Sequence, residues 1–102
     1  MGELTVIRWR DIPMQVVGRA SDGGSAKVLL SDRFQEAVDA AAMVAGLIGS
    51  DDYTAEMTID RRQIADEEIE AAVDAEAAKL ESSWTDDVLR AAIRRGGTRA
   101  SS

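Results

Sequence analysis

The segment 21–25, Ser-Asp-Gly-Gly-Ser, constrains the fold of this chain most, because it separates two short runs of apolar and β-branched residues. Glycine reaches positive φ at no steric cost, so a glycine pair in a polar segment favours a tight reversal of the chain. Val16 and Val17 lie at the centre of the preceding run, residues 14–20, and residues 26–30 form the following run. The sequence therefore predicts a β-hairpin made of these two strands.

A further strand precedes the hairpin. Residues 4–10 alternate with a period of two, which puts one set of side chains on each side of a strand. Pro13 lacks a backbone donor and holds the preceding residue extended, so we expect a turn or a bulge at residues 11–13. The first thirty residues thus predict a three-stranded meander. The two sides of its first strand are Thr5, Ile7 and Trp9 against Leu4, Val6 and Arg8.

A helix follows the meander. Ser31 or Asp32 can accept hydrogen bonds from the first free amides, and Gly46 is a natural C-terminal stop. The side chains at helical spacing between these ends form one apolar face: Phe34, Val38, Ala41, Ala42 and Ala45. Residues 53–60 then alternate with a period of two and predict a fourth, half-buried strand, although a helical start at Asp51 is an alternative interpretation.

Residues 66–84 give the strongest helical pattern, with Asp66 as the N-cap candidate. Their apolar stripe should face the sheet, and it consists of Ile69, Val73, Ala77, Leu80 and Trp84. Whether the acidic outer side of this helix is an interface or a solvated surface stays open. A final helix is capped at residues 85–87 and ends at the glycine pair 96–97.

The element order is therefore β-β-β-α-β-α-α, which indicates an α+β fold: a small, mainly antiparallel sheet with helices packed on one face. A chain of 102 residues fits one domain. We expect the domain to span residues 1–96 and residues 97–102 to form a flexible C-terminal tail.

The chain contains no histidine and no cysteine. Disulfides, thiolate nucleophiles, imidazole metal ligands and the Ser-His-Asp relay are therefore excluded. Carboxylate oxygens could still bind a hard cation, but residues 51–56 lack the ligand spacing of an EF-hand. Phosphate-loop and dinucleotide-binding glycine motifs are also absent. We expect no metal, no cofactor, no catalytic residues and no enzymatic activity.

The net charge is −7, and fifteen of the nineteen acidic side chains lie in residues 35–87. Phosphate backbones require clustered Lys and Arg, so this distribution argues against nucleic-acid binding. Residues 1–10 lack the pattern of a signal peptide, and no segment approaches the roughly 20 apolar residues of a membrane span. We therefore expect a cytoplasmic protein that does not enter a membrane.

Two segments could recognise an anion. Trp9, Arg10 and Asp11 stand together at a strand end, and the planar guanidinium of arginine binds carboxylates and phosphates through two hydrogen bonds. Arg33 and Gln35 open the first helix, where backbone amides are free. The competing interpretation is structural, with Trp9 in the core and the charged groups paired locally.

Three segments carry a resemblance to a known family: VIRWRDIP at 6–13, SAKVLLS at 25–31 and RFQEAVD at 33–39. Together they resemble the small bacterial family labelled "virulence factor", mainly over residues 3–60, which is similar to the C-terminal domain of the conserved virulence factor C proteins. Stand-alone members often sit beside genes of folate- and corrinoid-linked one-carbon metabolism. The resemblance therefore implies an accessory subunit of such a bacterial metabolic system.

The sequence favours a non-catalytic protein-interaction module, with another protein subunit as its partner; a homo-oligomer stays open. The alternative is a binder of small anionic molecules, or a cofactor-free enzyme, that uses Arg10, Asp11 and Arg33. RNA binding on the sheet ranks last, because it requires exposed aromatic side chains for base stacking.

Overall fold

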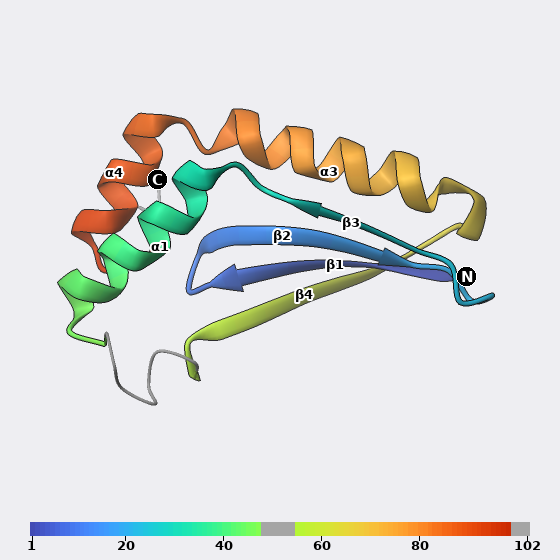
Figure 1. Cartoon of the computed structure of the whole chain (residues 1–102), viewed down its shortest axis with the longest axis horizontal. Coiled ribbons are helices and arrows are strands. Elements are labelled where there is room, and N and C mark those ends of the chain that lie inside the picture. Colours follow the sequence, from blue (N-terminus) through green and yellow to red (C-terminus); the bar gives the residue numbers. More distant parts are fainter. Residues whose placement is uncertain (48–54, 99–102) are drawn as a thin grey trace.

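The computed structural model describes residues 1–47 and 55–98 of the chain. It confirms the predicted α+β fold and element order (Figure 1). The elements are β1 (Gly2–Trp9), β2 (Ile12–Arg19), β3 (Ser25–Leu29), α1 (Asp32–Ala45), β4 (Met57–Ile64), the short 3-10 helix η1 (Asp66–Glu68), α3 (Ile69–Ser83) and α4 (Asp86–Arg94).

The four strands form one antiparallel sheet in the order β3-β2-β1-β4. The predicted hairpin is β2–β3, in which Val16 lies opposite Val28 and Val17 opposite Lys27. Strand β4 returns to the other side of β1, so β3 and β4 are the two edges of the sheet.

The predicted bounds of the fourth strand, residues 53–60, are wrong. Strand β4 spans Met57–Ile64, while residues 53 and 54 and the alternative helical start at Asp51 lie outside the described residues. The ladder with β1 runs without a break from the Trp9–Met57 pair to the Gly2–Ile64 pair. Pairing with β1 therefore sets the limits of this strand, and local alternation does not.

The chain reverses between β1 and β2 at Arg10 and Asp11, so the turn predicted at residues 11–13 begins one residue earlier. Pro13 itself lies within β2, opposite Arg8. The register shifts between Ile7 and Arg8, and a bulge of this kind increases local twist. Beyond the shift Trp9 is fully buried, so the predicted grouping of Trp9 with the half-buried Thr5 and Ile7 is wrong.

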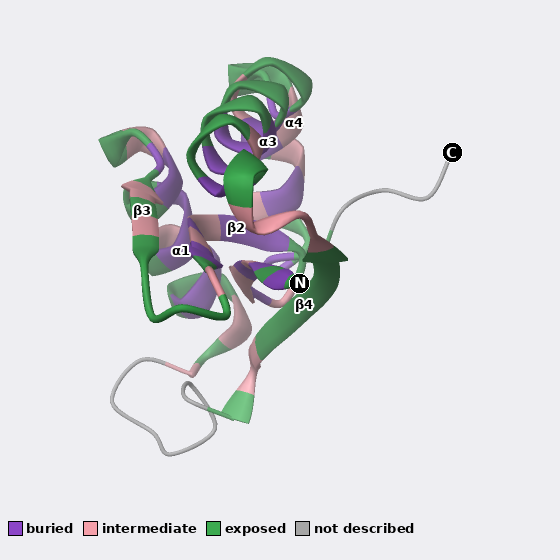
Figure 2. Ribbon diagram, turned by 90° about the vertical axis from the view of Figure 1, so that its right-hand side faces the viewer, coloured by how far each residue is buried: buried purple, intermediate pink, exposed green. Residues whose placement is uncertain are grey.

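Helix α3 covers one face of the sheet, as the view along the strands shows (Figure 2). The contact is close at Gly18, where a Cβ atom would lie 2.6 Å from a methyl group of Val73. Asp66 does not cap this helix, because it lies in η1 and accepts hydrogen bonds from Ser21. The predicted stripe is buried throughout: Ile69, Val73, Ala77, Leu80 and Trp84.

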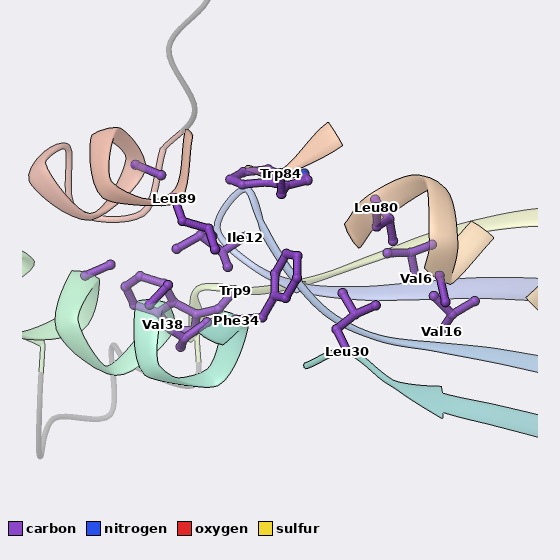
Figure 3. Packing of buried hydrophobic residues seen from close by; sticks show 14 of the residues in the cluster. Val6, Trp9, Ile12, Val16, Leu30, Phe34, Val38, Leu80, Trp84 and Leu89 are labelled. Atoms are coloured by element: carbon purple, nitrogen blue, oxygen red, sulfur yellow. The ribbon is translucent and has the colours of Figure 1, made fainter. Parts of the chain in front are cut away.

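Helices α1 and α4 pack against each other at the end of the sheet where β1 turns into β2 (Figure 1). The left-handed cap at Gly46 (φ 74°) and the Thr85 cap, whose hydroxyl accepts from the Val88 amide, confirm two predicted helix ends. Buried side chains of both helices surround Trp9 (Figure 3). Within the described residues, no helix has the length and apolar content that crossing a membrane requires.

Candidate functional site

Trp9, Arg10 and Asp11 lie together at the β1–β2 turn, where Arg10 binds other parts of the same chain. Its Nη1 donates to the Gly96 carbonyl at 2.9 Å, and its Nε lies 3.4 Å from a carboxylate oxygen of Glu56. Its guanidinium carbon is 5.2 Å from the centroid of the Trp9 ring, within the range of a cation–π contact. Arg10 therefore joins the turn to the end of α4 and to the residue before β4.

Asp11 is exposed, and its backbone completes this junction. Its amide donates to the Gly97 carbonyl at 3.1 Å, and its carbonyl accepts from Arg8 at 3.3 Å. Gly97, which the sequence assigned to the C-terminal tail, is buried against Trp9.

Arg33 lies in a different place, at the end of α3. Its Nη2 donates to the Glu81 carbonyl at 2.6 Å and its Nη1 donates to the Trp84 carbonyl. The same guanidinium contacts the carboxylates of Glu81 and Asp86 and stacks 4.5 Å from the Phe34 ring. These contacts satisfy carbonyl groups that the end of a helix leaves without partners.

Glu81, near the end of α3, accepts hydrogen bonds from Ser31 and Arg33 at the start of α1. The backbone amide and hydroxyl of Ser31 donate to its carboxylate at 2.7 and 2.9 Å. Burial acts to raise the pKa of Glu81, but the Ser31 hydrogen bonds and the Arg33 guanidinium outweigh it and lower that pKa below its ordinary value. Ser31 and Arg33 thus hold the start of α1 against the end of α3.

The predicted anion-binding residues do not form one site. Gln35 is exposed, and its amide nitrogen donates to Asp39 at 3.2 Å, one turn along α1. The residues that bind Arg10 differ from those that bind Arg33: Gly96 and Glu56 for the first, Glu81 and Asp86 for the second. Trp9 lies in the core, as the structural interpretation of the sequence expected, but both arginines bind distant segments of the chain where that interpretation expected local pairing.

Apolar and charged side chains lie together on a different surface. This surface is the face of the sheet opposite α3, here called the open face. The strand registers align its residues in two rows. One row is Leu29, Gln15, Ile7 and Ile59, and the other is Lys27, Val17, Thr5 and Arg61. Arg19 and Glu3 form the next pair toward the ends of the strands. One row thus has apolar residues at both edge strands, the other has cations there, and Ile7 and Val17 lie between them beside Gln15 and Thr5.

Two shallow hollows follow the open face and meet at Val17 and Arg19. The larger, about 480 Å³, extends along the β2–β3 hairpin to Ser21, Gly23, Ser25 and Lys27. The smaller, about 260 Å³, extends across β1 to β4 and is lined by Glu3, Thr5, Ile7, Ile59 and Arg61. Trp9, Arg10, Asp11, Arg33 and Gln35 line neither hollow.

The open face is basic although the chain as a whole is acidic. It carries Arg19, Lys27 and Arg61 against the single carboxylate of Glu3, which lies 3.6 Å from Arg61. Among the residues that the structure describes, Arg19 and Lys27 have no ion-pair partner. The sequence contains a signal for this surface, since these cations occupy outward positions of three strands, but only the register brings them together.

Across residues 1–47 and 55–98, acidic side chains do not gather in groups of three that could hold a metal ion. No curated protein and no solved structure matches the chain. One protein family matches residues 7–93, which extends the similarity well beyond residue 60. That match covers most of the chain, and the chain therefore belongs to the family described as Virulence factor.

Proposed function

We propose that this domain is a non-catalytic protein-interaction module that binds a partner protein through its open face. The observation that carries the proposal is an uncovered sheet face on which exposed apolar side chains lie beside cations. Ile59 is 51% exposed and Leu29 is 69% exposed, and both belong to the row that crosses all four strands through Ile7. Contiguous apolar surface rimmed by charged groups is typical of interaction sites.

The contacts of Arg10 and Arg33 argue against the alternative of a small-anion binder or a cofactor-free enzyme. Each guanidinium already donates to backbone carbonyl groups. If an anion took these donors, the carbonyl groups would lose their hydrogen bonds. Each buried carbonyl left without a partner costs roughly 1–3 kcal/mol of free energy. The open face needs no such rearrangement.

Pairing with a second copy through the β4 edge is disfavoured by charge. Strand β4 is an exposed edge, but two-fold antiparallel pairing with itself places the central residue opposite its own copy. If the two-fold axis passes beside Asp60, Arg61 or Arg62, that residue faces the same residue of the second copy. Like charges then lie opposite each other, which is destabilising. The centre of β4 thus disfavours self-association through this edge.

The identity of the complex rests on the family resemblance alone. Within that resemblance, we propose that the domain is an accessory subunit of a bacterial metabolic complex in the cytoplasm, of the folate- and corrinoid-linked one-carbon type. The partner then performs the chemistry, and this domain supplies contact surface.

Affinity purification from a lysate of the encoding bacterium tests the proposal, with mass spectrometry to identify partners and light scattering to size the complex. The matched variants place an aspartate on an exposed apolar position: Ile59→Asp and Leu29→Asp on the open face, Met43→Asp and Val44→Asp on α1. We expect the wild-type and the α1 variants to retain one stoichiometric partner that the open-face variants lose. Circular dichroism checks that every variant is folded.

A partner retained equally by all four variants would contradict docking on the open face. A monomer that retains nothing from the lysate would contradict the interaction module itself.

A further inference from the structure

Strand β4 carries two adjacent arginines whose side chains lie on opposite faces of the sheet, because the side chains of successive strand residues alternate between the two faces. Arg62 lies on the α3 side, where its Nη1 is 3.2 Å from a carboxylate oxygen of Glu76. Glu76 is a helix residue and is only 9% exposed. Arg61 lies on the open face, and within residues 1–47 and 55–98 it pairs with Glu3 alone, at 3.6 Å; both of these side chains are at least half exposed.

The covered face, which is the face of the sheet under α3, shows which kind of helix this sheet binds. Helix α3 is acidic and rich in alanine, and it packs Val73 and Ala77 in the same core as Leu4, Val6 and Val16. Glu76 then extends from the helix to the edge strand and pairs with Arg62. Helix α3 lies over this face of the sheet (Figure 2). The sheet therefore binds α3 through an apolar centre and a carboxylate–arginine pair at its β4 margin.

The open face repeats these features without a helix on it. Its centre contains Ile7 and Val17, and cations stand at both margins: Arg61 on β4 and Lys27 on β3, with Arg19 between them on β2. The three cations make this face positive on a chain of net charge −7, so a partner surface of negative charge is complementary to it.

We propose that the open face binds an acidic amphipathic helix of the partner protein, in the same manner as the covered face holds α3. This inference rests on the proposed function and adds the chemistry of the partner. An eight-residue strand is about 26 Å long, and a helix of 15–18 residues spans about 22–27 Å, so one such helix crosses the face. Its apolar residues contact Ile7, Val17 and Ile59, and its carboxylates pair with Arg19, Lys27 and Arg61.

Two designed 18-residue peptides serve as probes. Both have leucines at i, i+3, i+4 and i+7; one has glutamate at the flanking positions and the other has lysine there. Titration into the ¹⁵N-labelled protein by NMR gives both the affinity and the location of binding. We expect the glutamate peptide to bind at least tenfold more tightly than the lysine peptide and to shift the amide signals of Ile7, Val17 and Ile59. Its affinity should fall between 50 and 500 mM salt, because screening increases.

The double substitution Arg19→Glu/Lys27→Glu should reverse the preference between the two peptides. The matched control, Arg94→Glu/Arg95→Glu, changes the net charge equally on exposed residues at the end of α4 and should leave the preference unchanged. Equal binding of both peptides to the wild-type, or shifts confined to other surfaces, would overturn the inference. Light scattering that shows a dimer lost in Arg19→Glu/Lys27→Glu would also overturn it, since the occupant would then be a second copy.

The same double variant, used as bait in the lysate, separates the two proposals. A partner that is lost by Ile59→Asp but retained at full yield by Arg19→Glu/Lys27→Glu would leave the proposed function in place and refute the acidic helix.

Discussion

Gly97 lies directly against the ring of Trp9. A Cβ atom at Gly97 would be 2.6 Å from Cζ3 of Trp9, and the backbone of Gly97 has a φ of +108°. Its carbonyl meanwhile accepts the hydrogen bond of the Asp11 amide. The end of α4 thus closes over the β1–β2 turn because residue 97 has no side chain.

Gly97→Ala should lower the free energy of unfolding by about 3 kcal/mol, because the left-handed backbone and the Trp9 contact both oppose a methyl group. Gly23→Ala is the matched control, since Gly23 has a φ of +96° but no atom within 4 Å of the added Cβ. We expect about 1 kcal/mol there, from backbone strain alone. Urea unfolding of both variants measures the difference, and equal losses would show that the Trp9 contact is unimportant.

Arg33→Ala should cost about 2 kcal/mol of stability, because it removes hydrogen bonds to the carbonyls of Glu81 and Trp84 together with two carboxylate contacts. Arg33→Lys should recover only part of the loss, since an ammonium cannot reproduce the fork of a guanidinium. Arg90→Ala, which removes an exposed pair with Asp87, should leave the stability nearly unchanged. Equal chemical-denaturation midpoints for Arg33→Ala and Arg90→Ala would contradict a joining role for Arg33.

Arg62→Ala should destabilise the fold by about 1–2 kcal/mol, because it leaves the buried carboxylate of Glu76 without its partner. Arg61→Ala is its neighbour on the open face and should change stability by less than about 0.5 kcal/mol. Thermal unfolding of both variants and of the double variant Arg62→Met/Glu76→Met tests the pair. The double variant should recover most of the lost stability, since it removes both charges at once. If Arg61→Ala and Arg62→Ala proved equally costly, the two faces would not differ as the structure indicates.

The lowered pKa of Glu81 makes the junction between α1 and α3 sensitive to acid. Because the folded protein binds this proton less tightly than the unfolded chain, the ionised carboxylate stabilises the fold above its ordinary pKa of 4.5. That contribution is lost as the pH falls through the lowered folded value. Glu81→Gln should cost about 1 kcal/mol at pH 7, since partial exposure screens the contacts, and much less at pH 3. Urea titrations at the two pH values measure this, with the exposed Asp74→Asn as control; a penalty independent of pH would refute it.

Local patterns were sufficient for most of the elements. The period of the apolar residues predicted α3 and its five buried side chains, and the glycines at 23–24 and at 46 marked a turn and a helix end that the structure contains. These signals depend on the residues of one segment, so no knowledge of the remaining chain is needed to interpret them.

The fourth strand and the role of Trp9 could not be predicted in this way. Pairing with β1 places the strand at Met57–Ile64. Trp9 follows the register shift beside Ile7 and is buried, whereas simple alternation placed it on the same side as the half-buried residues of β1. Arg10 and Arg33 looked like free anion ligands because their partners, Gly96 and Glu81, lie 86 and 48 residues away in the chain.

By itself, then, the sequence determined the three-stranded meander and the helices, and the apolar side of α3, because those properties arise within a few neighbouring residues. The tertiary structure alone decided that Arg19, Lys27 and Arg61 share one uncovered face while Arg62 pairs with Glu76 on the other. The physical reason is that a strand exposes alternate residues to opposite sides, and only hydrogen-bonded register between distant segments fixes which residues lie beside one another.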